Sequence, residues 1–211
     1  MRVYSQRPLA VMTVLTLCTS TQFVQATVPQ SIGGMEHAEV FWDVQTESLS
    51  VVNTAPTLVM LNHGESYAPP ADVLDGKGYN NQPGFLKGQA FAPPVGTEIW
   101  VEVLAISPGL ETYEGGMRAM AANHTYAPIL SSVGERWKWN GSMHHPWYAA
   151  AAFGDYSVDY RVYIGEASTG APLAQYGADT TTFDLVYAPE PSGLVLMLAG
   201  CALAVRRKVT R

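Results

Sequence analysis

Apolar and polar side chains alternate from Tyr156 to Val162, and the apolar positions continue to Ile164. Positions 156, 158, 160, 162 and 164 are aromatic or aliphatic, whereas Ser157, Asp159 and Arg161 are polar. A period of two is typical of a strand with one buried face. Related alternations or short apolar runs recur at 38–44, 49–52, 57–61, 99–105 and 181–187. These segments predict several short strands, and in this pattern Val44 and Ala105 face the core.

Turn-forming residues fill much of the remaining chain. Residues 64–96 contain Pro69-Pro70, Asp75-Gly76 and Pro83-Gly84, and residues 107–140 form a second such segment with one helical turn at 117–122. This density of Gly and Pro excludes long helices, so we expect both segments to run over the surface. Without crossover helices a parallel α/β fold is disfavoured. We therefore predict an all-β fold for residues 27–188, a single antiparallel β-sandwich or jelly-roll-like domain.

The N-terminal 26 residues have the order of a secretory signal peptide. Arg2 and Arg7 precede or flank an apolar stretch at 9–17, and a polar segment then ends in Val24-Gln25-Ala26. The apolar stretch is too short to span a bilayer comfortably, and cleavage after a small residue is typical of such segments. We expect residues 1–26 to form a signal helix that is removed, the alternative being a helix retained in the domain.

The C-terminal segment, residues 189–211, has three parts in a fixed order. Pro189-Glu190-Pro191 is followed by an apolar run at 193–205 and then by Arg206-Arg207-Lys208. Cations placed after an apolar run stay in the cytoplasm, so the preceding domain would face outward. We expect the run to form a short transmembrane helix that holds the chain transiently in the inner membrane.

This tail resembles the PEP-CTERM sorting signal of bacterial exported proteins. The resemblance implies that Pro189, Glu190 and Pro191 form the sorting motif, and that the secretion machinery and an exosortase-type processing enzyme are partners. It also implies cleavage near the motif and delivery to the cell surface or extracellular matrix. The alternative is a C-terminal anchor that is never cut.

Removal of both ends changes the charge of the protein. Residues 27–188 keep 6 of the 12 Lys and Arg and 17 of the 18 Asp and Glu, a formal charge of −11, and they contain neither Cys18 nor Cys201. A chain this acidic repels anionic polymers, so we expect no nucleic-acid partner. The absence of cysteine from this segment excludes disulfides, thiol nucleophiles and Cys-ligated zinc there.

The histidines suggest a metal site as one alternative function. His37 and Glu39 lie two residues apart, so they share a strand face, and His63 ends a predicted strand. His144 and His145 can ligate one ion together if, as their Gly and Pro flanks indicate, they lie on a loop. Imidazole suits zinc and related divalent ions. The candidate ligands are thus His37, Glu39, His63, His144 and His145, although no known ligand spacing is present and no cofactor is required.

Aromatic residues suggest a second alternative, a carbohydrate-binding module. Trp137, Trp139, Trp147 and Tyr148 lie close together in the sequence, and exposed aromatic rings stack against sugars. An exopolysaccharide would be a natural partner of an exported protein. The spacing of Trp137 and Trp139 also fits one strand face turned toward the core.

No enzymatic motif is present in the sequence. There is no nucleophile elbow, no His-Glu-x-x-His and no Gly-rich phosphate loop. We expect an exported, non-catalytic structural or binding protein.

Overall fold

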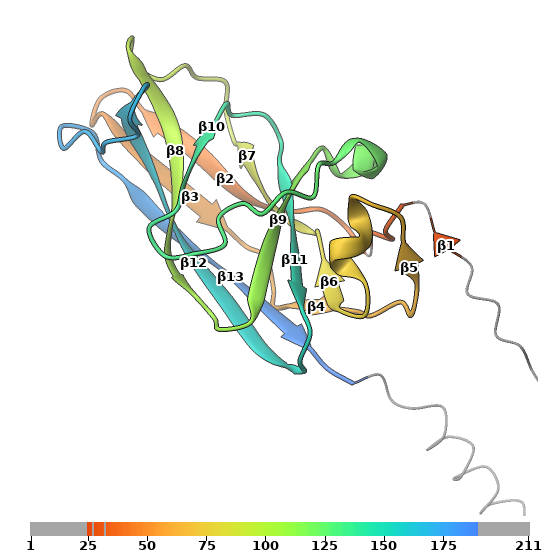
Figure 1. Cartoon of the computed structure of the whole chain (residues 1–211). Coiled ribbons are helices and arrows are strands. Elements are labelled where there is room, and N and C mark those ends of the chain that lie inside the picture. The colour runs from red at the N-terminus through yellow and green to blue at the C-terminus, as the bar shows by residue number, and fades with distance from the viewer. Residues whose placement is uncertain (1–24, 27, 32, 190–211) are drawn as a thin grey trace, which may run out of the picture.

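The computed structural model of the protein describes residues 25–26, 28–31 and 33–189. These residues form β-strands joined by turns, with two short 3₁₀ helices (Figure 1). The prediction of a predominantly β protein is therefore confirmed. The predicted signal segment lies outside the described residues up to position 24, and so does the predicted tail from position 190 onward.

The elements follow one another along the chain in this order: β1 (Gln25–Ala26), β2 (Glu36–Asp43), β3 (Ser48–Asn53), β4 (Leu58–Met60), β5 (Ser66–Tyr67), η1 (Ala71–Leu74), β6 (Gly78–Asn80), β7 (Pro83–Lys87), β8 (Thr97–Ile106), β9 (Leu110–Gly116), η2 (Arg118–Asn123), β10 (Arg136–Trp139), β11 (His145–Ala150), β12 (Gly154–Glu166) and β13 (Asp179–Tyr187). The period-two segment at 156–164 lies within β12, and the predicted helical turn largely coincides with η2.

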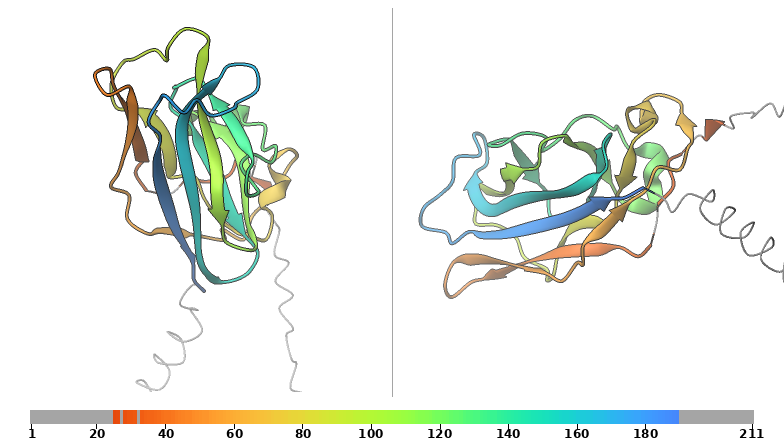
Figure 2. Two further views of the ribbon diagram at one scale, coloured as in Figure 1. Left: turned by 90° about the vertical axis from the view of Figure 1, so that its left-hand side faces the viewer. Right: turned by 90° about the horizontal axis from the view of Figure 1, so that it is seen from below.

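The largest sheet has the strand order β10-β8-β12-β13-β4. Adjacent strands within this sheet are antiparallel, except that β13 and β4 run parallel to each other. A second sheet has the order β3-β2-β7 and a third the order β6-β11-β9, while β1 pairs with β5. In the left-hand view of Figure 2, the blue β13 lies between the orange β2–β3 hairpin and the teal β12.

The main core joins the large sheet to the β3-β2-β7 sheet. Phe85 of β7 lies at its centre: its ring is 5.4 Å from that of Tyr160 on β12 and 5.6 Å from that of Phe183 on β13, both in edge contacts. All three side chains are almost fully buried. Burial of a large aromatic side chain contributes roughly 2–3 kcal/mol, so this group holds the two sheets together.

A second, smaller core lies on the other side of β11. Every residue of β11 is buried, and its side chains alternate between the two cores. Tyr148 belongs to the main core, whereas Trp147 packs with Tyr79 and Tyr126 in the smaller one. β11 is thus a central strand covered on both faces, which explains why its sequence shows no polar alternation.

Two positions expected in the core lie outside it. Val44 is 76% exposed because β2 ends at Asp43, whose Oδ1 accepts the N–H groups of Gln45 and Thr46 and turns the chain. Ala105 is exposed because the register between β8 and β12 shifts at Asp159 and reverses the alternation there. A β-bulge has this effect on every residue beyond it.

Neither of the two turn-rich segments is the surface excursion that the sequence predicts. Residues 64–96 contain β5 to β7 and bury Tyr79, Asn80 and Phe85. Residues 107–140 contribute β9 and β10 and bury Leu130 and Trp139. Their strands are short, and the backbone bridges Leu61–Tyr79 and Phe85–His144 connect the first of the two segments to its neighbours.

Candidate functional site

A pocket opens where β9, β10 and the turn before β11 meet. Its volume is about 320 Å³. Its lining combines an aromatic ring, an imidazole and several polar groups: Glu114, Gly116, Trp137, Lys138, Asn140, Ser142, Met143 and His144. A concave site with one aromatic surface and a few convergent polar groups is the usual form of a small-molecule site.

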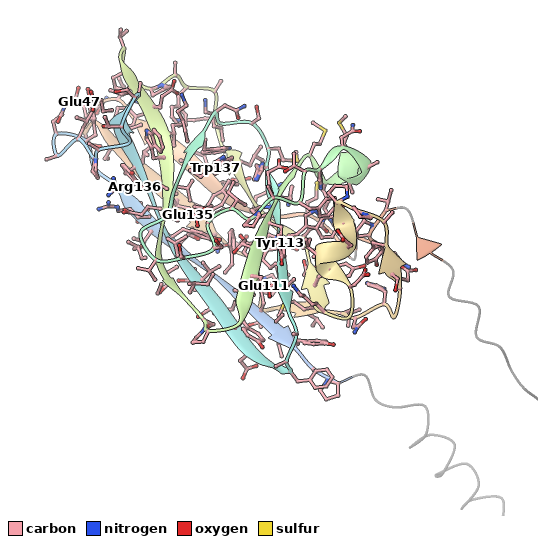
Figure 3. The ribbon with its side chains drawn as sticks, in the orientation of Figure 1. Glu47, Glu111, Tyr113, Glu135, Arg136 and Trp137 are labelled. Carbon is pink, nitrogen blue, oxygen red and sulfur yellow. The ribbon has the colours of Figure 1, made fainter. Side chains whose placement is uncertain are left out.

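Trp137 provides the aromatic wall of this pocket. It lies on β10, the edge strand of the large sheet, and is only partly buried (Figure 3). Its ring centroid is 4.4 Å from that of His144, with the two planes 38° apart, and 6.5 Å from that of Phe85. The contact with the core fixes the orientation of the indole, while its partial exposure leaves part of the ring accessible.

His144 is held beneath Trp137 by the backbone. Phe85 N–H donates to the His144 carbonyl at 2.8 Å, and His144 N–H donates to the Phe85 carbonyl at 3.0 Å. Burial lowers the pKa of His144 to about 4, so the imidazole is neutral at pH 7. Its buried Nε2 has no hydrogen-bond partner among the described residues. A neutral imidazole at the pocket wall supplies a flat surface without a charge.

The turn at 140–142 shapes the polar rim. Asn140 Oδ1 accepts Ser142 N–H at 2.8 Å, and Trp139 Nε1–H donates to the Ser142 carbonyl at 2.7 Å. Gly141 has a φ of 79°, and a Cβ there would lie 1.9 Å from Cε of Lys87. On the opposite rim, the Glu114 carboxylate accepts the N–H and hydroxyl of Thr125. Both rims are therefore built from fixed hydrogen bonds.

Three of the four aromatic residues predicted to bind sugar are unavailable. Trp139, Trp147 and Tyr148 are each 0% exposed, because they fill the two cores. Of these four residues, Trp137 lines the pocket of about 320 Å³. The i, i+2 spacing places Trp137 and Trp139 against the same core, as the alternative interpretation of the sequence expects.

The predicted metal ligands are distributed over several places. His37 of β2 and His145 of β11 meet with their Nε2 atoms 3.2 Å apart. His63 instead packs against Tyr79, and His144 against Trp137. Within the part of the chain that the structure describes, no group of three or more His, Cys, Asp or Glu residues is arranged to hold a metal ion.

The two adjacent histidines do not share a loop. His145 begins β11, and His144 forms an isolated bridge with Phe85 just before it. Their side chains point to opposite sides of the extended backbone, as successive residues of a strand do, so they cannot bind one ion together.

A second pocket, of about 270 Å³, is lined by Ser31, Gly33, Met35, Arg118 and Ala119. Sequence analysis missed this pocket and the polar rim of the first, since Glu114, Lys138 and Ser142 belong to no motif. The Asn140-Gly141-Ser142 turn was the one local signal available, because Asn-Gly favours a tight turn.

Comparison with protein-family models yields no matching family, and comparison with curated proteins yields no matching relative. Over the described residues, no helix combines the length and the apolar character needed to cross a bilayer. The chemistry of the pocket is therefore the basis for assigning a function.

Proposed function

We propose that this chain is an exported, non-catalytic binding protein of a bacterial cell surface or extracellular matrix, and that its Trp137 pocket takes a sugar ring of a neutral matrix polysaccharide. The observation that carries the proposal is the partly exposed indole of Trp137 in a pocket of about 320 Å³ with amide, hydroxyl and carboxylate groups on its rim.

The residues of the pocket match the chemistry of a sugar ring. A pyranose presents C–H groups on its faces and hydroxyls around its edge. The Trp137 face suits the C–H groups, while Glu114, Asn140 and Ser142 suit the hydroxyls. The formal charge of −11 over residues 27–188 disfavours an anionic polymer. A neutral glycan is the class that meets both conditions.

The proposal includes a finer description of the fold, a β-sandwich. Phe85 brings the β3-β2-β7 sheet against β12 and β13, and side chains from the two inner faces interdigitate around it. This is how the layers of a sandwich pack. A sandwich also places edge strands such as β10 at its rim, where a ligand can reach them.

The export part of the proposal is supported by the sequence alone. Residues 1–26 have the composition of a signal peptide, and residues 189–211 resemble a PEP-CTERM tail. Mass spectrometry of the protein recovered from its host tests this part. The proposal predicts a chain that begins at residue 27 and ends near residue 190, whereas a full-length chain retained in the membrane would support the uncut anchor instead.

Sugar binding is tested by affinity electrophoresis of the purified protein in gels containing neutral polysaccharide from the bacterial matrix. We expect Trp137→Ala to weaken binding about tenfold, which corresponds to about 1.4 kcal/mol of lost ring contact. Trp42→Ala is the matched control, because Trp42 is also partly buried but packs on Phe91 and Tyr176. Equal binding by the Trp137→Ala and wild-type proteins would refute the assignment of the pocket.

A further inference from the structure

Two imidazoles from distant parts of the chain face each other at one end of the fold. His37 on β2 is paired with Gly84 on β7, and β11 follows on the other side of β7. Gly84 has no side chain, so the ring of His145 lies over it and reaches His37. The two Nε2 atoms are 3.2 Å apart, and the ring centroids are 5.0 Å apart.

The backbone fixes the tautomer of His145. Its Nδ1 lies 2.9 Å from the Gln82 carbonyl oxygen, which can only accept a hydrogen bond, so Nδ1 carries the proton. With its proton on Nδ1, the ring presents the Nε2 lone pair toward His37. Histidines that ligate metals are usually oriented by such a bond from the other ring nitrogen.

The separation of the two nitrogens matches the spacing of two ligands on one ion. With Zn–N bonds of about 2.0–2.1 Å and a tetrahedral angle, neighbouring ligand nitrogens lie about 3.3 Å apart. The observed separation of 3.2 Å is within a tenth of an ångström of this value. An ion can therefore bind between the two rings at the observed nitrogen separation once the proton on His37 Nε2 has moved to Nδ1 by exchange with solvent, which leaves both imidazoles neutral.

The charges around the pair are mixed. The carboxylates of Glu39 and Glu36 interact electrostatically with His37. They make the potential at His37 more negative and so favour a cation. Arg118 opposes them, but its guanidinium donates to the Gly33 and Gly34 carbonyls, both at 2.9 Å.

From this geometry we infer that His37 and His145 form a two-histidine site for a late first-row divalent ion, Zn²⁺, Ni²⁺ or Cu²⁺. Imidazole nitrogen is a preferred ligand for all three, and Cu²⁺ binds most tightly of the three. Water fills the remaining coordination positions on the side of His37, the less buried of the two rings. The site is independent of the Trp137 pocket, so its existence does not rest on sugar binding.

The test is calorimetric titration of the full-length purified protein with Zn²⁺. We expect one equivalent of Zn²⁺ to bind. Removing a residue that only hydrogen-bonds to a metal ligand weakens metal binding by up to about 100-fold, so His37→Gln, which removes a ligand itself, should weaken binding by at least about 100-fold. His63→Gln is the matched control and should bind as the wild type does, because His63 packs against Tyr79. Gln preserves the size of the partly exposed His37, and thermal melting verifies the fold of both variants.

A second readout uses Cu²⁺. The electron paramagnetic resonance spectrum of the bound ion should show coupling to two imidazole nitrogens in the wild type and to one in His37→Gln. Absence of detectable binding at about 0.1 mM Zn²⁺ would overturn the inference. Unchanged binding by His37→Gln, or an equal loss in His63→Gln, would overturn it as well.

Discussion

Gly84 and His145 are packed so closely that no side chain fits between them. A Cβ on Gly84 would lie 2.6 Å from Nδ1 of His145 and 2.5 Å from the His144 carbonyl oxygen. One of these neighbours is backbone and the other is a buried ring, so neither can move aside at low cost. The absence of a side chain at Gly84 is what allows β7 and β11 to approach.

Gly84→Ala is therefore expected to destabilise the protein. Overpacking of this kind costs about 1–3 kcal/mol, and urea unfolding followed by circular dichroism measures it. Gly34→Ala is the control, since a Cβ there has nothing within 4 Å and should change stability by less than about 0.5 kcal/mol. Equal stability of the two variants would show that the backbone at Gly84 adapts freely.

Phe85→Ala should be one of the most damaging substitutions in the chain. Phe85 is 0% exposed and contacts the rings of Tyr160 and Phe183, so truncation leaves a cavity between the two sheets. The expected loss in the free energy of unfolding is about 3–5 kcal/mol. Phe153→Ala provides the comparison: Phe153 is 58% exposed, so its loss should be below about 1 kcal/mol.

Glu102 forms the centre of a three-residue ion cluster on the outer face of the large sheet. It lies on β8 directly opposite Arg136 on β10 and Arg161 on β12, and it accepts a hydrogen bond from each. The two arginines cover it, so Glu102 is only 7% exposed although it faces away from the core. Its removal leaves two cations facing each other.

Glu102→Ala should cost about 1–3 kcal/mol in chemical denaturation, less than a fully buried pair because both arginines are partly exposed. The exposed pair Lys138–Glu98, with its charged atoms 4.0 Å apart, offers a contrast on the same sheet. Glu98→Ala is expected to cost less than about 0.5 kcal/mol. A cost for Glu102→Ala no larger than that for Glu98→Ala would contradict the role of the cluster.

Glu135 should make stability depend on acidic pH. Partial burial raises the pKa of its carboxyl. The N–H groups of Ser131 and Leu130 donate to the carboxylate and together lower the pKa by more than burial raises it, so the pKa lies below the ordinary value of 4.5. A carboxyl group whose pKa is lower in the folded than in the unfolded protein stabilises the fold at pH values above the unfolded-state pKa. This stabilisation is lost as the pH falls through the folded-state pKa.

Glu135→Gln is therefore expected to be less stable than the wild type at pH 7, with the difference shrinking below pH 4.5. Urea unfolding at a series of pH values measures this. Asp184→Asn, at an exposed position of β13, serves as the control. Its difference in unfolding free energy from the wild type should change much less between pH 7 and the acidic end of the series. A gap between Glu135→Gln and wild type that persists unchanged at pH 3 would indicate a role other than charge.

The strands with one buried face could be predicted from the sequence because their polar residues mark the period. Thr181, Phe183, Leu185 and Tyr187 are all buried as the alternation requires, and so are Val158 to Ile164 at even positions. β11 could not be found in this way, since both of its faces are covered and its residues are uniformly apolar or aromatic apart from His145. The bulge opposite Asp159 likewise has no local signature.

The candidate sites were less predictable because they depend on contacts between distant segments. The sequence identifies His37 and His145 as possible ligands, but only the pairing of β2 with β7, and of β7 with the start of β11, brings them together. Similarly, Trp137 and Trp139 have the same local pattern, yet one lines a pocket and the other is fully buried. Trp139 Nε1–H donates to the Ser142 carbonyl in the turn at 140–142, whereas Trp137 lies on the pocket wall.

β13 ends at Tyr187, and the exposed Pro189 follows two residues later. This strand pairs with β12 over nine positions on one side and with β4 on the other. Hydrogen bonds between antiparallel strands run perpendicular to the strand axis, so tension applied at Pro189 along β13 loads the ladder in shear, and many bonds must fail at once. If the chain is attached through this segment, as the proposed export route implies, the load passes into β13 and is shared by both of its neighbouring strands.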